Sequence, residues 1–258
     1  MQELRRAFMA LGYFTRIPIP KWVGWAPDEL NRAARYFPLA GLIVGAIAAC
    51  VAWLAALVLP WSLAVLTSMA ASLVLTGGFH EDGLADATDG FGGGWQRADV
   101  LRIMKDSRIG SFGAMALIMG LLTKFVALDA LGNAGPLLPC LALVVIHPLS
   151  RAAALWIMAV LPYVRDEDSR AKPVAQGIGA IEISVGLVTG ALPLVLVATI
   201  GPFAMHPWLG ALVAIILAAW LCRRYFARRL EGYTGDCLGM AQQLCELAGY
   251  MALCIRWA

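Results

Sequence analysis

Long apolar runs fill most of this 258-residue chain and constrain its fold more than any other feature. A helix that crosses the hydrocarbon of a bilayer needs about 20 mostly apolar residues. Seven segments meet this requirement, at residues 36–59, 62–79, 110–131, 137–161, 180–201, 208–222 and 237–257. The last is interrupted by Gln242, Gln243 and Glu246. The runs predict an all-α integral membrane protein, a bundle of about seven transmembrane helices.

The composition agrees with this fold class. Hydrophobic residues make up 60% of the chain and charged residues 14%, whereas soluble domains have about 45–50% apolar and about 25% charged residues. The lipid bilayer is therefore the expected solvent and a partner of the chain. The net charge of +3 is small and the basic residues are dispersed, which argues against a nucleic-acid partner. No internal repeat is evident, so residues 1–258 are expected to form a single membrane domain.

The N-terminal segment predicts a short amphipathic helix at the membrane interface. Its apolar run, residues 7–14, is too short for a span and leads into a proline-stiffened segment at 15–20. It lacks the small-residue cleavage site of a signal peptide.

Basic residues are distributed unevenly among the connections. All but three of the 20 Lys and Arg residues precede the first span or lie between spans two and three, four and five, or six and seven. The exceptions are Lys124, Arg151 and Arg256. By the positive-inside rule, this pattern predicts a multi-pass protein of the cell (inner) membrane with a cytoplasmic N-terminus. The acidic segment 80–89 would lie on the same side.

Segment 80–89 is the strongest candidate for chemistry. Four of the chain's 17 acidic residues fall within nine positions here. In a helix, Asp82, Asp86 and Asp89 share one face, where like charges repel. A cation reverses that repulsion, and Mg²⁺ suits carboxylates that leave room for water and phosphate ligands. The alternative is an ordinary solvated acidic loop.

Other groups lie near this segment in the sequence. Gly77 and Gly78 would let a phosphate approach the backbone. His80 adjoins the carboxylates and is a candidate general base. Lys105 and Arg108 could hold phosphate oxygens, or could serve as positive-inside anchors.

Charges within the predicted spans require partners. Arg151, in the middle of a span, implies an acidic partner or a bound anion. Helical spacing places Asp236 on one side with Gln243 and near Glu246. This polar side could carry a second metal or a substrate hydroxyl, or it could pair with Lys124 or Arg151.

Several motifs together resemble one family. The pattern G-G-F-H-x-D-G-L-A-D-x-x-D-G at 77–90 resembles the signature of the cobalamin (adenosylcobamide 5'-phosphate) synthases, also called adenosylcobinamide-GDP ribazoletransferases. Blocks at 14–20, 37–41, 104–110, 150–151 and 233–239 resemble further family motifs in the same order. Glu81 departs from the pattern, since the family usually has an apolar residue there. Glu81 is therefore given no ligand role.

The resemblance implies a transmembrane helical fold, a Mg²⁺ requirement and a late step of cobalamin assembly. The implied reaction transfers adenosylcobinamide phosphate from adenosylcobinamide-GDP to α-ribazole or α-ribazole 5'-phosphate and releases GMP. The implied catalytic residues are His80, Lys105, Arg108 and Asp236. The implied substrate-binding residues are Gly77, Gly78, Arg16, Arg151 and Thr234, and the implied Mg²⁺ ligands are Asp82, Asp86 and Asp89. Other cobalamin-assembly enzymes, or a second copy of the chain, are further candidate partners.

Three other classes of protein fit these residues less well. A CDP-alcohol phosphotransferase usually carries Asp-Gly-x-x-Ala-Arg, but here Asp86 follows Ala85 where that motif has its Arg. A polyprenyl transferase needs two Asp-rich blocks, and this chain has one strong block. An ion-coupled transporter predicts acids spread over several spans, whereas the strong cluster here lies at one face.

Overall fold

A computed structural model describes residues 1–164 and 178–256. Apart from short 3-10 turns and one isolated bridge between Tyr163 and Tyr233, the regular structure in these ranges is α-helical. The α-helices are α1 (Gln2–Phe14), α2 (Pro27–Ala33), α3 (Phe37–Ala56), α4 (Trp61–Thr76), α5 (Phe79–Gly93), α6 (Arg97–Met104), α7 (Ser111–Leu131), α8 (Leu137–Val160), α9 (Ala180–Ile200), α10 (Met205–Leu230) and α11 (Gly235–Leu253). Three predicted basic loop residues, Arg165, Arg170 and Lys172, lie outside the described ranges, as does Trp257.

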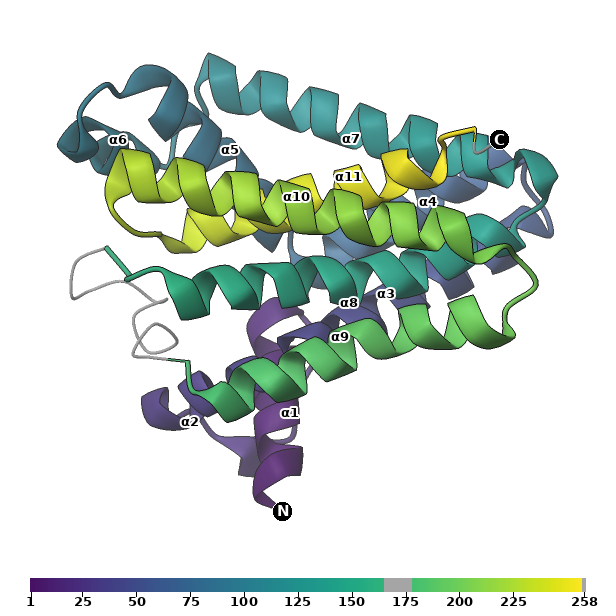
Figure 1. The fold of residues 1–258 in the computed structure, drawn as a ribbon, viewed down its shortest axis with the longest axis horizontal. Coiled ribbons are helices and arrows are strands. Elements are labelled where there is room, and N and C mark those ends of the chain that lie inside the picture. The colour runs from purple at the N-terminus through teal and green to yellow at the C-terminus, as the bar shows by residue number, and fades with distance from the viewer. Residues whose placement is uncertain (165–177, 257–258) are drawn as a thin grey trace.

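The long helices lie side by side along the long axis of the molecule, and α1 runs across them (Figure 1). Helix α8 packs extensively on α3, α9 and α11, and α11 also packs on α5 and α10. Helices α8 and α11 therefore form the interior of the bundle.

Five helical segments are long and apolar enough to cross a membrane: Glu29–Ala56, Ser111–Leu131, Leu137–Val160, Ala180–Ile200 and Met205–Leu230. A sixth span results if the bent pair α4 and α5 is counted as one. The all-α membrane bundle is thus confirmed, with five or six helices of this length and composition in the described residues where about seven were expected.

Helix α11 accounts for part of this difference. It was expected to form the last span, but it does not meet the criterion of length and composition. Gln242, Gln243 and Glu246 lower its hydropathy, and all three are buried. Eleven of its 19 residues are buried against other helices. Helix α11 is therefore a polar interior helix, shielded from lipid by its neighbours.

The second predicted span, 62–79, is broken near its end. Helix α4 stops at Thr76, and α5 starts at Phe79 with its axis turned by 85°. Gly77 and Gly78 form the corner with φ of 67° and 68°, a left-handed conformation that favours glycine. Two such residues in succession cannot continue a right-handed helix, so the acidic segment becomes a separate helix.

We expect the two corner glycines to respond differently to alanine. A Cβ on Gly78 would meet no other atom within 4 Å, so Gly78→Ala should cost only the left-handed penalty of about 1–2 kcal/mol. A Cβ on Gly77 would lie 2.7 Å from Nε of Arg16, so Gly77→Ala should cost more and displace Arg16. Denaturant unfolding in detergent measures both costs. Equal costs would contradict the close approach of Arg16 to Gly77.

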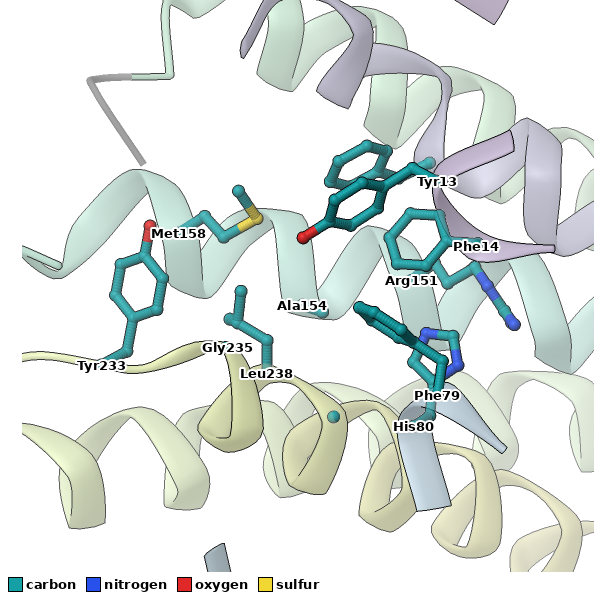
Figure 2. A pocket seen from close by; sticks show the side chains of 12 residues that line it. Tyr13, Phe14, Phe79, His80, Arg151, Ala154, Met158, Tyr233, Gly235 and Leu238 are labelled. Atoms are coloured by element: carbon teal, nitrogen blue, oxygen red, sulfur yellow. The ribbon is translucent and has the colours of Figure 1, made fainter. Parts of the chain in front are cut away.

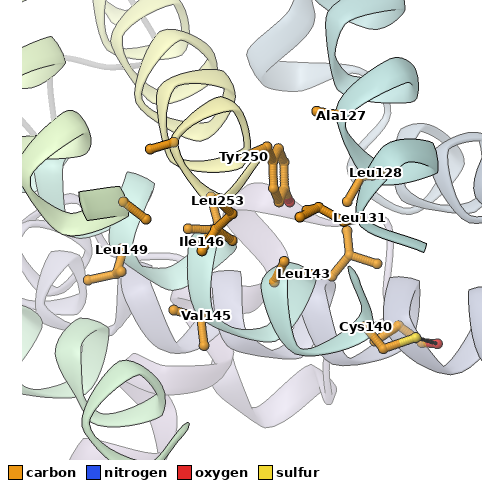
Figure 3. Packing of buried hydrophobic residues seen from close by; sticks show 14 of the residues in the cluster. Ala127, Leu128, Leu131, Cys140, Leu143, Val145, Ile146, Leu149, Tyr250 and Leu253 are labelled. Atoms are coloured by element: carbon orange, nitrogen blue, oxygen red, sulfur yellow. Dashed lines mark hydrogen bonds between the residues drawn. The ribbon is translucent and has the colours of Figure 1, made fainter. Parts of the chain in front are cut away.

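Two apolar clusters hold the bundle together. One joins α3, α4, α7, α8, α9, α10 and α11, with Ile146, Leu143 and Tyr250 near its centre (Figure 3). The other joins α1 and α2 to α5, α6 and the adjoining ends of α3, α8, α10 and α11. The second cluster includes Ala87 and Phe91 of α5 and therefore positions the acidic helix.

Helix α1 is amphipathic, as predicted, and starts earlier than the apolar run suggested. It buries Met9, Ala10 and Phe14, while Glu3 remains exposed. Arg6 is also buried, and its Nε donates a hydrogen bond of 2.8 Å to Glu29. After α1, the backbone N–H of Arg16 donates to the carbonyl of Leu75 at 2.8 Å. This bond joins the N-terminal segment to the end of α4.

Candidate active site

The acidic segment is helical, which is the condition under which its three aspartates share a face. Asp82, Asp86 and Asp89 lie on one face of α5 and become progressively less exposed along it. Asp82 is exposed, Asp86 is half-buried and Asp89 is buried. The face thus runs from an accessible end to an enclosed one.

The Asp89 carboxylate contacts the N-terminus of α7. Its two oxygens accept hydrogen bonds from the backbone N–H groups of Gly110, at 2.7 Å, and Gly113, at 2.8 Å. These donors have no partner within their own helix, and a carboxylate at a helix N-terminus is electrostatically favourable. Asp89 therefore fastens the connection between α6 and α7 to the acidic helix.

The carboxylates suit a Mg²⁺ ion as a pair rather than as a closed cage. Within the described residues, no group of three or more His, Cys, Asp or Glu side chains is arranged to hold a metal ion. Mg²⁺ is usually bound through one or two carboxylates, with water and substrate phosphates as its other ligands. Asp82 and Asp86, one turn apart on α5, can supply such a pair.

Alanine substitutions should separate the structural role of Asp89 from that of Asp82. Asp89→Ala removes the acceptor of two α7 N–H groups and should lower the free energy of unfolding by about 2 kcal/mol, the upper range for a helix cap. Asp82→Ala, at an exposed position, should change it by less than about 0.5 kcal/mol. Denaturant unfolding of both variants in one detergent measures the difference. Equal stabilities would show that Asp89 does not fasten α7.

Lys105 and Arg108 lie on the connection that Asp89 fastens. Both are exposed. The Arg108 guanidinium donates hydrogen bonds to Asp106, the shortest at 2.7 Å, and these lower the pKa of the Asp106 carboxyl to about 2. The Arg108–Asp106 pair therefore stays ionised at any ordinary pH. The structure thus joins the connection that carries both basic residues to the Asp89 end of α5, with Arg108 in a local ion pair.

Gly77, Gly78 and Arg16, predicted from separate motifs, meet at the corner before α5. The Arg16 side chain lies against Gly77, at a spacing that leaves no room for a Cβ. Arg16 is exposed, so its guanidinium is accessible at the corner.

His80 and Arg151 line a pocket on another side of α5 (Figure 2). His80 is buried and stacks on Phe14, with ring centroids 5.3 Å apart. Two residues along a helix correspond to a turn of about 200°, so His80 and Asp82 face opposite ways. Arg151 Nη1 donates to the carbonyl of His147 at 3.0 Å. Among the described residues, its buried Nε has no hydrogen-bond partner.

A buried ion pair connects α7 to α11. Lys124 pairs with Glu246, and both side chains are almost fully enclosed. Gln242 donates to the other oxygen of Glu246 at 2.5 Å. The sequence left open whether the polar side of α11 holds a metal, binds a substrate hydroxyl or pairs with Lys124 or Arg151. At Glu246, the structure shows the pair with Lys124.

Thr234 and Asp236 lie at the start of α11. Thr234 is fully buried, and its Oγ1 caps the helix by accepting from the backbone N–H of Cys237 at 3.2 Å. The backbone of Asp236 packs against Gly83, where a Cβ would approach the Asp236 carbonyl oxygen to 3.1 Å. The first turn of α11 is thereby held next to Asp82.

The aromatic lining of the pocket was not anticipated. Tyr13, Phe14, Phe37, Phe79 and Tyr233 come from four separate parts of the chain. Each adjoins or lies within a block that resembles the family's motifs. That position is the sequence feature from which these lining residues could have been predicted.

These features define a class of protein: a helical membrane protein with an acidic helix, a connection with basic side chains that is bound to this helix, and an adjoining aromatic pocket. The cobalamin-5-phosphate synthase family matches residues 6–254, and the chain belongs to that family.

Named relatives agree with this membership. The chain is 46% identical over 255 residues to the adenosylcobinamide-GDP ribazoletransferase of Shewanella oneidensis, covering 98% of this chain and 95% of the relative. It is 48% identical over 252 residues to the ribazoletransferase of Leptothrix cholodnii, with coverage of 97% and 95%. The corresponding protein of Shewanella woodyi is 47% identical over 253 residues, with coverage of 98% and 96%. No solved structure matches.

Proposed function

We propose that this chain is a membrane enzyme that transfers adenosylcobinamide phosphate from adenosylcobinamide-GDP to α-ribazole or its 5'-phosphate. An acceptor hydroxyl attacks the phosphorus on the cobinamide side of the diphosphate. The bridging P–O bond breaks, GMP leaves, and adenosylcobalamin or its 5'-phosphate forms. Relatives of 46–48% identity over nearly their whole length carry the name of this activity.

The main structural support for this proposal is that the connection with Lys105 and Arg108 is bound to the acidic helix α5. Asp89 binds the N–H groups of Gly110 and Gly113 and so holds segment 105–110 against α5. Carboxylates and cationic side chains are thus carried by two segments that are fastened together, an arrangement that suits transfer between diphosphate and hydroxyl. Such transfers depend mainly on positioning and on neutralising charge.

The roles follow from these positions. Asp82 and Asp86 would hold Mg²⁺, which when bound neutralises the diphosphate, with Asp89 completing the acidic face from its enclosed end. Lys105 and Arg108 would steady the nonbridging oxygens and the departing GMP, which requires Arg108 to exchange Asp106 for phosphate. Arg16, at the corner formed by Gly77 and Gly78, would contact the substrate there.

The hydroxyl proton needs an acceptor. His80 lines the pocket, and Asp236 lies beside the helix turn that carries Asp82, so either side chain could receive it. Both are candidates, His80 from the first turn of α5 itself and Asp236 from the first turn of α11, which packs on Gly83.

We further propose that the bundle lies in the cell (inner) membrane with this site on the cytoplasmic side. The basic residues before α3, around α6 and at the end of α10 support that orientation. Nucleotide substrates are available on that side.

Reconstitution tests the proposed function. Purified protein in proteoliposomes, given adenosylcobinamide-GDP, α-ribazole and Mg²⁺, should release GMP and form a corrinoid product in equal amounts. Chelation of Mg²⁺ should stop both. Folded protein that forms neither product would overturn the proposal.

A further inference from the structure

An apolar cleft lies between α8, α9 and α10, separate from the aromatic pocket beside α5. Helices α9 and α10 both pack on α8, and they contact each other less than either contacts α8 (Figure 1). Alanine, leucine, isoleucine and tryptophan side chains line the space between them. The cleft has a volume of about 360 Å³, within the roughly 300–1,000 Å³ of ordinary small-molecule sites. It is therefore large enough to hold a ligand.

The cleft is elongated along the helices. Residues 212–220 of α10 line it over roughly 12 Å and residues 149–156 of α8 over roughly 10 Å, at a rise of about 1.5 Å per residue. A long and wholly apolar groove suits a hydrocarbon chain that lies parallel to the helices.

The cleft opens on the outer surface of the bundle. Its lining residues Leu187, Ile216 and Trp220 are 43%, 58% and 42% exposed. The three helices that form it are all long and apolar enough to cross a membrane. In a membrane-spanning bundle, such a surface meets lipid acyl chains, which are as apolar as leucine side chains. A lipid is thus the hydrocarbon ligand available to this cleft.

One end of the cleft is next to basic side chains. The Arg224 guanidinium lies over the ring of Trp220, 4.8 Å from its centroid, and Trp220 lines the cleft. Arg228 follows one turn later on α10, and both arginines are exposed. Tryptophan next to exposed arginine is typical of the level at which lipid headgroups lie. The cleft therefore continues from the apolar interior of the membrane to a basic surface.

The basic end of α10 has an excess of positive charge. Helix α10 contains no Asp or Glu. Glu231, directly after it, pairs with Arg97 at 3.2 Å, and Glu182, at the start of α9, pairs with Arg35. Because these neighbouring carboxylates bind other arginines, Arg224 and Arg228 present an attractive surface for an anion.

We propose that this cleft binds an anionic phospholipid. One acyl chain lies along α8 between α9 and α10, and the lipid phosphate contacts Arg224 and Arg228. A helix of a second copy of the chain, about 10 Å across, is too wide for a cleft of this length and volume. The lipid site is separate from the substrate site and does not depend on the proposed reaction.

The headgroup contact is tested by native mass spectrometry of the full-length protein released from detergent micelles. Phosphatidylglycerol and phosphatidylcholine with the same acyl chains are added at equal concentrations, and retained lipid is counted. Wild type should retain more phosphatidylglycerol. Arg224→Gln should weaken phosphatidylglycerol binding about fivefold, the effect of one basic side chain at an anionic membrane surface, and leave phosphatidylcholine binding unchanged.

Arg102→Gln is the matched control for this variant. Arg102 is an exposed arginine on α6 that pairs with Asp99 at 3.5 Å. This substitution removes the same charge elsewhere and should leave the binding of both lipids unchanged.

The acyl-chain contact is tested by filling the cleft. Ala153 is half-buried in the α8 wall of the cleft, so Ala153→Leu takes up space for the chain and should weaken binding of both lipids by the same factor. Ala70→Leu adds the same side chain at an exposed position on α4 and should change neither.

Three results would overturn the proposal. Equal retention of the two lipids by wild type would refute the preference for an anionic headgroup. Equal losses for Arg224→Gln and Arg102→Gln would show diffuse charge attraction instead of a site. Wild-type lipid retention by Ala153→Leu would remove the lipid from the cleft, and a change in oligomeric mass of that variant would then assign the cleft to a second copy. Arg224→Gln alters an exposed side chain, so the headgroup test stands even if Ala153→Leu does not fold.

Discussion

Asp86→Asn should lower the rate of Mg²⁺-dependent GMP release by about 10²–10³-fold, the usual loss when one group that stabilises developing charge is removed. Asn keeps the shape of the side chain but removes the negative charge that attracts a cation. Asp86 is half-buried on the exposed half of the acidic face, one turn from Asp82. The loss should therefore affect cation binding more than folding. The measurement is the initial rate of GMP release in proteoliposomes over a range of Mg²⁺ concentrations.

Asp99→Asn is the matched control for this variant. Asp99 is a partly exposed carboxylate on α6 that pairs with Arg102 across one helical turn at 3.5 Å. Its loss should leave GMP release nearly unchanged. For Asp86→Asn, the Mg²⁺ concentration for half-maximal rate should also rise. A wild-type rate with a wild-type Mg²⁺ dependence would remove Asp86 from the metal site.

Lys124→Met should destabilise the fold by about 3–5 kcal/mol, the cost of leaving one member of a buried ion pair without its partner. Lys124 and Glu246 have side chains only 5% and 1% exposed. Without Lys124, the Glu246 carboxylate retains Gln242 as a hydrogen-bond donor, with His147 Nε2 at 3.6 Å. The measurement is the free energy of unfolding in mixed detergent micelles.

A double variant and an exposed pair complete this experiment. Lys124→Met combined with Glu246→Gln should cost about 2 kcal/mol less than the two single losses added, because the second change removes the unpaired charge. Arg102→Met breaks the exposed pair with Asp99 and should cost less than about 1 kcal/mol. Additive losses at Lys124 and Glu246 would contradict a direct ion pair.

The sequence predicted the features that depend on local pattern. Apolar runs of about the right length gave α3, α7, α8, α9 and α10, because the hydrophobic thickness of the bilayer fixes the length of a span. Spacing alone indicated that the three aspartates share a helix face.

Features that depend on contacts distant in sequence were not predictable in this way. The corner after Thr76 requires two successive left-handed glycines, and a Gly-Gly pair within an apolar run does not specify that conformation. Asp89 was grouped with Asp82 and Asp86 by spacing, yet its oxygens are bound by backbone groups of α7 more than 20 residues away. The polar residues of α11 weakened it as a span, and only the tertiary structure shows Lys124 as the partner of Glu246.

The fate of the donor's two phosphorus atoms tests the central claim most directly. Adenosylcobinamide-GDP labelled with ³²P only at the phosphate on the cobinamide side is incubated with the purified protein, α-ribazole and Mg²⁺. The proposed attack predicts that all transferred label enters the corrinoid product while the released GMP is unlabelled. Labelled GMP, or release of GDP in place of GMP, would contradict it.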